Sequence, residues 1–340
     1  MNSKKIGQQT LALSQPIYIA AAANAVGQKE SEGPLSPFFD YADADDTFSQ
    51  KTWEKAESAM QEKALELAKE KAHVTSSDLD FLFAGDLLNQ CIGSAYAARD
   101  AKRPFFGLYG ACSTMGEGLA LASMTLDGGF GRYAAVVASS HFCTAERQYR
   151  TPLEYGGQRT PTAQWTVTGA GAVILSKEPE SCAITHVTIG SVVDQGIRDT
   201  NNMGAAMAPA AHETILSNLR DTGRSPDYYD LIVTGDLGYL GHELMIELFR
   251  QDGLSLEVNS TDCGILIFDA KRQDVHCGGS GCGCAASVLT GYLLDGLRAG
   301  QWHNILFCPT GALHSPTSAM QGESIPGICH AIALSSQPSH

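Results

Sequence analysis

One cysteine stands at a corner of the chain where it could act as a nucleophile. Cys112 follows the apolar run Phe105–Tyr109 and a tight turn at Gly110, and a helical pattern of small residues runs from Ser113 to Leu126. The unpaired backbone N–H groups at a helix start favour an anion, which predicts a lowered pKa for the Cys112 thiol. This corner would suit a nucleophile or the carboxylate of a bound ligand. A plain buried cysteine is the alternative interpretation.

Two aspartates follow apolar runs that predict β-strands, and one glycine separates each aspartate from its run. Asp86 comes after the run Leu79–Ala84, and Asp236 comes after the run Tyr229–Thr234. Their carboxylates could contact a ligand, or they could cap the adjacent turns.

The elements that would position these residues occur twice. The string FLFAGDL at 81–87 matches LIVTGDL at 231–237, and the glycine corner with its small-residue helix at 110–131 recurs at 278–300. Strands alternate with helices in both copies, which favours mostly parallel sheets covered by helices. We therefore predict two halves, residues 1–178 and 179–340, with a further strand at Cys263–Phe268. Chance similarity between short apolar motifs is the alternative.

Length and composition indicate a globular protein whose main partner is not nucleic acid. The chain has 340 residues, 44% of them apolar and 18% charged, with a formal net charge of −14. The apolar runs are too short to cross a bilayer, and the N-terminus lacks the sustained apolar core of a signal peptide. Ten cysteines without secretory features should be mostly reduced. Cys282 and Cys284 form a C-x-C pair, for which close packing at a helix start is favoured over metal ligation.

Three features together resemble the thiolase superfamily. They are Gly110-Ala-Cys112-Ser, Met203-Gly204 with Pro209-Ala210, and the glycine corner at 277–286. The resemblance implies an α/β protein, with two duplicated halves stacked as five layers, αβαβα, around two buried central helices. It also implies that Cys112 occupies the nucleophile position and that the protein forms a homodimer.

The other catalytic positions of that superfamily do not match. The resemblance places Ser280 or a neighbour where thiolases carry Gly-His-Pro, and Asp236 where they carry Asn-Glu or a histidine motif. Cys308 could match their second, acid–base cysteine, and His141 and His314 follow strands and could reach the site. Claisen condensation needs a base beside the nucleophile and donors for the thioester oxygen, so we predict loss of catalysis and no cofactor.

Longer strings resemble a family of sporulation proteins from endospore-forming bacteria, an offshoot of the same superfamily. They are ASSHF at 138–142, AERQYR at 145–150, TPTAQW at 160–165 and QGESIPG at 321–327. This resemblance implies binding of dipicolinate (pyridine-2,6-dicarboxylate), as the free acid or its calcium chelate, for uptake into the developing spore. It further implies membrane subunits of the same transport system as partners, and a peripheral position at the spore inner membrane.

A pocket for this flat dianion needs N–H or cationic donors and an apolar slot. Arg147 and Arg150 could form a fork for a carboxylate, and His141 could donate depending on pH; a solvated arginine and a satisfied buried histidine are the alternatives. Asp86 and Asp236 would suit the calcium chelate, whose net charge is near zero. The predicted ligand-binding residues are Cys112, Ser113, Ser140, His141, Arg147, Asp86, Asp236, Ser280 and Cys308.

Three functions stay open from the sequence. The first is non-catalytic binding of dipicolinic acid within a transport system. The second is an acyltransferase of the thiolase or ketoacyl-synthase type that uses Cys112. The third is an assembly scaffold that keeps a vestigial pocket.

Overall fold

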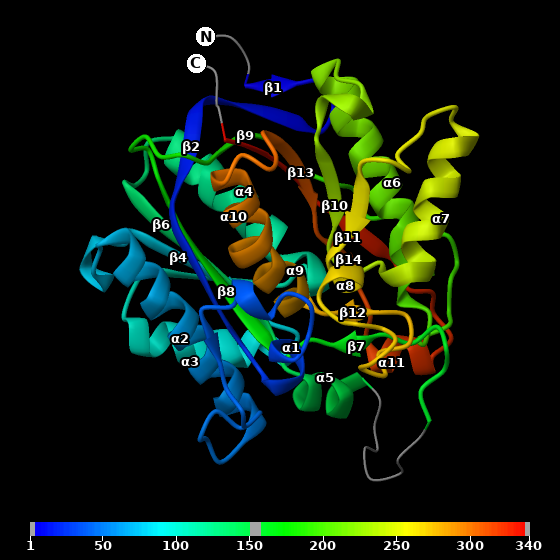
Figure 1. Ribbon diagram of the computed structural model, residues 1–340, viewed down its shortest axis with the longest axis horizontal. Helices are drawn as coiled ribbons and strands as arrows, with labels where there is room; N and C mark the ends of the chain where they lie inside the picture. The colour runs from blue at the N-terminus through cyan, green and yellow to red at the C-terminus, as the bar shows by residue number, and fades with distance from the viewer. Residues whose placement is uncertain (1–3, 150–157, 337–340) are drawn as a thin grey trace.

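The computed structural model, which describes residues 4–149 and 158–336, contains two half-sheets of equivalent order (Figure 1). The first half-sheet runs β5 (Phe105–Leu108), β4 (Phe81–Gly85), β6 (Tyr133–Ser140), β8 (Gly169–Ser176) and β2 (Thr10–Val26). The second runs β11 (Ser260–Asp262), β10 (Leu231–Thr234), β13 (Asn304–Cys308), β16 (Ala331–Ser335) and β9 (Ala183–Thr188).

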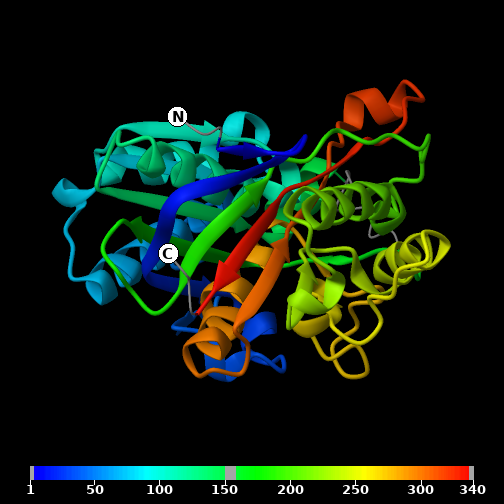
Figure 2. The same cartoon turned by 90° about the horizontal axis from the view of Figure 1, so that it is seen from above.

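The two half-sheets share one pairing pattern. β4 pairs in parallel with β5 and β6, and β10 pairs in parallel with β11 and β13. The next two strands of each half are antiparallel, and β2 pairs with β9 to join the halves into one sheet. Figure 2 shows the central strands side by side, from β2 in blue to β13 in orange. The order of strands thus repeats in the way that the sequence repeat predicts.

Helices cover both half-sheets on both faces. α2 (Trp53–Ala72) and α3 (Ile92–Ala101) pack on the outer face of the first, and α6 (Met203–Thr222) and α7 (Gly238–Gln251) on that of the second. α4 (Thr114–Asp127) lies between the half-sheets together with α9 (Cys282–Val288), a π-helical turn at 289–293 and α10 (Leu294–Arg298). The predicted five-layer αβαβα fold is confirmed.

Side chains along each strand alternate between two cores, because successive residues point to opposite faces. On β4, Leu82 joins the core under α2, and Phe83 joins the central core. On β13, Leu306 joins the core under α6, and Phe307 joins the central core. Burial on both faces explains why these strands are continuous apolar runs in the sequence.

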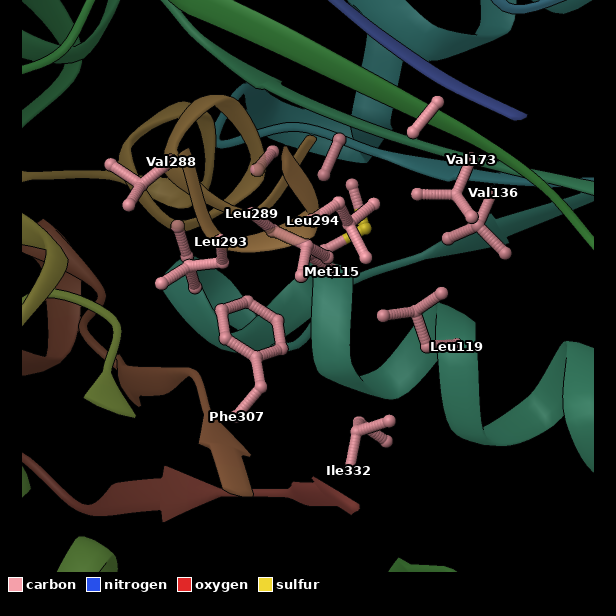
Figure 3. Packing of buried hydrophobic residues seen from close by; sticks show 14 of the residues in the cluster. Met115, Leu119, Val136, Val173, Val288, Leu289, Leu293, Leu294, Phe307 and Ile332 are labelled. Carbon is pink, nitrogen blue, oxygen red and sulfur yellow. The ribbon is translucent and has the colours of Figure 1, made fainter. Parts of the chain in front are cut away.

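The central helices meet through closely packed apolar side chains (Figure 3). Met115 and Leu119 of α4 lie in one cluster with Leu289 and Leu293, all of them fully buried. Gly118 brings α4 equally close to the sheet, because a Cβ added there would lie 2.6 Å from a methyl of Val136 on β6. The buried α4 fixes the corner that carries Cys112.

One strand predicted from the sequence is wrong. The stretch Cys263–Phe268 begins with a short helix, α8 (Cys263–Leu266), and the strand β11 ends just before it at Asp262. The Asp262 carboxylate accepts a hydrogen bond from the Gly264 N–H and so caps this helix. A short buried apolar run has no periodicity that distinguishes a helix from a strand.

The remaining elements are short. In the described residues, every helix is too short or too polar to cross a membrane. The other strands and helices are β1 (Lys5–Ile6), α1 (Gln28–Ser31), β3 (Tyr41–Ala42), α5 (Phe142–Tyr149), β7 (Trp165–Thr166), β12 (Gly279–Ser280), β14 (Thr310–Ala312), α11 (Pro316–Met320) and β15 (Gly327–Cys329).

Candidate functional site

A cavity of about 80 Å³ lies at the corner that precedes α4 and is lined by both halves of the chain. Cys112 stands in a single 3₁₀ turn, Ala111–Ser113, directly before α4. Ala111 has φ of 49°, a left-handed conformation that is uncommon outside glycine and often marks functional sites. The lining residues are Leu87, Ala111, Cys112, Ala145, Glu146, Tyr149, Thr166, Thr200, Met203, Met207, Asp236, Ser280, Ala312 and His314.

Three of the predicted residues meet in this cavity: Cys112, Asp236 and Ser280. The Asp236 carboxylate interacts with the Cys112 thiol and raises its pKa. Ser280 Oγ donates to Asp236 Oδ2 at 2.9 Å, and Thr310 Oγ1 donates to Oδ1 at 2.8 Å. Asp236 is therefore the acceptor at the centre of the cluster, and Cys112 is its neighbour.

The prediction of a lowered pKa for Cys112 is wrong. Burial, followed by the negative charge of Asp236, raises the pKa of the Cys112 thiol well above its ordinary value. Burial also raises the pKa of Asp236 to about 6, against the hydrogen bonds it accepts. Burial and the charge of Asp236 raise the pKa of Cys112 more than the helix start lowers it, so Cys112 is a protonated thiol at neutral pH.

The Asp236 corner is held by residues that the sequence analysis did not select. Asp262 is fully buried, and its carboxylate accepts hydrogen bonds from the N–H groups of Leu237 (2.9 Å) and Gly238 (3.0 Å). Gln164 Nε2, from the unusual string at 160–165, donates to the Asp236 carbonyl at 2.6 Å. For Gln164, the unusual string at 160–165 was the only signal in the sequence. Asp262 had no such signal, because it lies next to a stretch that the apolar pattern predicts as a strand.

Tyr149 and His314 form another wall of the cavity. Tyr149 Oη donates to the Leu87 carbonyl at 2.9 Å and lies 2.9 Å from Tyr109 Oη. The rings of Tyr149 and His314 have centroids 5.4 Å apart. Their rings, with Leu87 and nearby methionines, supply apolar surface to the cavity lining, and the Asp236 cluster supplies polar groups.

Comparison with known proteins identifies the family. The family model described as stage V sporulation protein AD matches residues 7–335. The stage V sporulation protein AD of Bacillus subtilis (strain 168) is 45% identical over 331 residues, which cover 97% of this chain and 98% of that protein.

This chain belongs to the stage V sporulation protein AD family.

The solved structures that resemble this family member are condensing enzymes. Cerulenin-bound OleA of Xanthomonas campestris has a TM-score of 0.61 at 14% identity, over 98% of this chain and 99% of that one. For 3-oxoacyl-[acyl-carrier-protein] synthase III of Aquifex aeolicus VF5 the TM-score is 0.58 at 13% identity, over 94% and 99%. Human mitochondrial 3-ketoacyl-CoA thiolase in complex with CoA also gives 0.58 at 13% identity, over 96% and 99%. At such identities the likeness shows the fold alone.

Three other predicted residues of this sporulation protein use their polar atoms within the fold. Asp86 accepts hydrogen bonds from the N–H groups of Leu88 (2.9 Å) and Ser94 (2.7 Å), and so caps the chain at the start of α3. Ser113 Oγ donates to the Gly110 carbonyl at 2.7 Å. Ser140 Oγ donates to the Val167 carbonyl at 2.7 Å. These three side chains are outside the cavity lining.

The remaining predicted residues also lie outside the cavity lining. His141 is fully buried, and its Nε2 lies 2.6 Å from the Asp46 carbonyl, as in a satisfied structural histidine. Arg147 forms an ion pair with Glu54. Cys308 joins the core under α6, on the opposite face of the half-sheet from the central helices. Arg150 lies outside the described residues.

The two cysteines of the C-x-C pair lie in the first turn of α9. Cys282 Sγ donates to the Ser139 carbonyl at 2.8 Å, and Cys284 Sγ lies 3.5 Å from the Gly235 carbonyl. Each thiol thus packs against the end of a strand, one in each half-sheet.

The Cys112 thiol is expected to react slowly with iodoacetamide at pH 7. Its raised pKa leaves little thiolate, so we expect alkylation at least about tenfold slower than for free cysteine. The rate would be followed by mass spectrometry of the Cys112 peptide, with the unfolded chain as the control. Asp236→Asn removes the nearby negative charge and should accelerate the reaction. A native Cys112 that reacts faster than free cysteine would contradict the assignment.

Proposed function

We propose that this chain binds dipicolinic acid without transforming it, for uptake of this acid into the developing spore. Membership of a sporulation family supports the biological setting. The observation that carries the proposal is the position of Cys112 beside a carboxyl group in the lining of a cavity between the two halves. A nucleophilic thiol must lose its proton, and both the burial of Cys112 and the negative charge of Asp236 oppose this loss.

The cavity has the chemical character that a flat aromatic acid requires. Its apolar side contains Leu87 and Tyr149, against which a pyridine ring could pack. Its polar groups include the Thr166 hydroxyl, which can donate to a carboxylate oxygen. We further propose that the protein acts at the spore inner membrane as a homodimer with membrane subunits of the same transport system.

Titration calorimetry with dipicolinate, with and without calcium, tests this proposal. We expect saturable binding to the full-length protein. Ala312→Phe places a ring in the cavity and should weaken binding about tenfold or more, because it occupies the space of the ligand. Leu121→Phe, at a half-exposed position on α4, is the matched control and should bind normally. A flat isotherm up to the solubility limit of the ligand would refute the function.

Acyl transfer is the alternative that the fold suggests, and it makes a different prediction. An acyltransferase would form a thioester on Cys112 with acyl-CoA, visible as a mass shift that Cys112→Ala abolishes. We expect no such adduct at any chain length. An adduct on Cys112 would replace the binding proposal by an enzymatic one.

A further inference from the structure

Among the described residues, His314 is the one histidine that lines the cavity, and its ring has no hydrogen-bond partner there. The residue is only 9% exposed, and within the described residues neither Nδ1 nor Nε2 has a hydrogen-bond partner. Buried polar atoms in native proteins are nearly always paired, because an unpaired one costs free energy. His314 lines the cavity, and its ring lies next to the Tyr149 ring. An imidazole in this position is available to a ligand.

The cavity offers no permanent positive charge to an anionic ligand. In the described part of the chain, its lining contains no lysine or arginine. The titratable groups that face it are Glu146 and Tyr149 from α5, Cys112 before α4, Asp236 after β10, and His314 itself. Two of these are carboxyl groups and two are neutral hydroxyl or thiol groups. Among the described residues of the lining, only His314 can therefore offer a cationic partner to a ligand with two carboxylates.

On the basis of the proposed function, we infer that His314 binds a carboxylate of the ligand and takes up a proton from solvent when the dianion enters. Before binding, burial without a nearby counter-charge lowers the pKa of His314 from its ordinary value, so the ring is neutral at pH 7. A carboxylate beside the ring reverses this effect, because an opposite charge favours the protonated form. The imidazolium N–H then donates to the carboxylate, a charge-assisted hydrogen bond.

This coupling fixes the sign of the pH dependence. The complex holds one more proton than the free protein plus ligand, so affinity rises as pH falls. Between the pKa of His314 in the free protein and its pKa in the complex, affinity changes about tenfold per pH unit. Below the pKa of the free protein, His314 is already protonated, and its contribution to the pH dependence ends.

Calorimetry with sodium dipicolinate in two buffers of different ionisation enthalpy measures the proton uptake directly. At pH 7.5 we expect the wild-type protein to take up at least one proton per ligand bound. His314→Asn keeps a neutral donor and should take up one proton fewer, with a flatter dependence of affinity on pH. His314→Lys supplies a permanent positive charge, so it should bind dipicolinate without the proton that His314 takes up in the wild type. Asp236 and Glu146 are the two carboxyl groups of the lining that could also gain a proton. Asp236→Asn removes one of them and should keep the proton taken up by His314.

A matched control is His212→Asn, because His212 pairs with Asp252 outside the cavity and should leave the proton uptake unchanged. If His314→Asn takes up as many protons and binds as tightly as the wild type, the role of His314 is refuted while dipicolinate binding stands. If binding requires calcium and proceeds without proton uptake, the metal supplies the charge and the role of His314 is again refuted. If the wild type does not bind in any condition, the proposed function fails, and this inference fails with it.

Discussion

The Asp262→Asn variant is expected to lose about 1–3 kcal/mol of unfolding free energy, because at least one buried N–H group loses its acceptor. Each carboxylate oxygen of Asp262 accepts two hydrogen bonds. Oδ2 accepts from Thr234 Oγ1 at 2.7 Å and from the Leu237 N–H at 2.9 Å. Oδ1 accepts from the N–H groups of Gly238 at 3.0 Å and Gly264 at 2.9 Å. An amide has one acceptor oxygen, so its NH₂ group would face the N–H groups of Gly238 and Gly264 in one orientation. In the other it would face the Leu237 N–H, while the Thr234 hydroxyl can turn to accept.

Urea unfolding at pH 7 measures this loss, and Asp221→Asn is the matched control. Asp221 also accepts hydrogen bonds from three backbone N–H groups, those of residues 8, 9 and 10, but it lies where water can replace them. We expect that control to cost about 1 kcal/mol or less. Because Asp262 fixes the corner that carries Asp236, the variant should also bind dipicolinate more weakly. Equal losses of unfolding free energy in the two variants would show that Asp262 stabilises the fold no more than Asp221 does.

The Gly283→Ala variant is expected to be destabilised by about 3 kcal/mol or more, through overlap of backbones that cannot separate. Gly283 lies in the first turn of α9, and a Cβ there would stand 2.2 Å from the Gly169 carbonyl oxygen and 2.8 Å from the Ser140 nitrogen. Its N–H also donates to Ser140 Oγ at 3.1 Å. The start of this central helix thus rests directly on the ends of β6 and β8, with no space for a side chain.

Gly107→Ala is the control for this substitution. Gly107 lies in the edge strand β5, and a Cβ there would meet only the Phe105 ring, at 3.4 Å, an ordinary contact. Thermal unfolding should place this variant within about 0.5 kcal/mol of the wild type, as for most surface substitutions. If Gly283→Ala were as stable as Gly107→Ala, close packing of α9 against β6 and β8 would not require a glycine at position 283.

Local pattern was sufficient to predict most elements of the fold. The runs around Phe81–Gly85 and Leu231–Thr234 are apolar and short, and the small-residue stretch Thr114–Asp127 has helical length. The repeated order of these elements predicted two halves of the same topology, which the strand order bears out. The stretch that begins at Cys263 was predicted as a strand, because the length and periodicity of a short apolar run do not distinguish a strand from a helix. The Asp262 side chain decided the outcome by capping a helix.

The sequence by itself determined the αβαβα fold, the family, and the presence of a thiol at the start of the central helix. Tertiary structure alone decided the chemical state of that thiol and which residues share its cavity. Cys112 meets Asp236 across 124 positions of sequence only because the half-sheets face one another, and burial together with that contact keeps the thiol protonated. His141 and His314 follow strands in the same way, yet one is satisfied by a backbone carbonyl and the other faces the cavity. The physical reason is that burial and the nearest charge set a side chain's role, and both depend on distant parts of the chain.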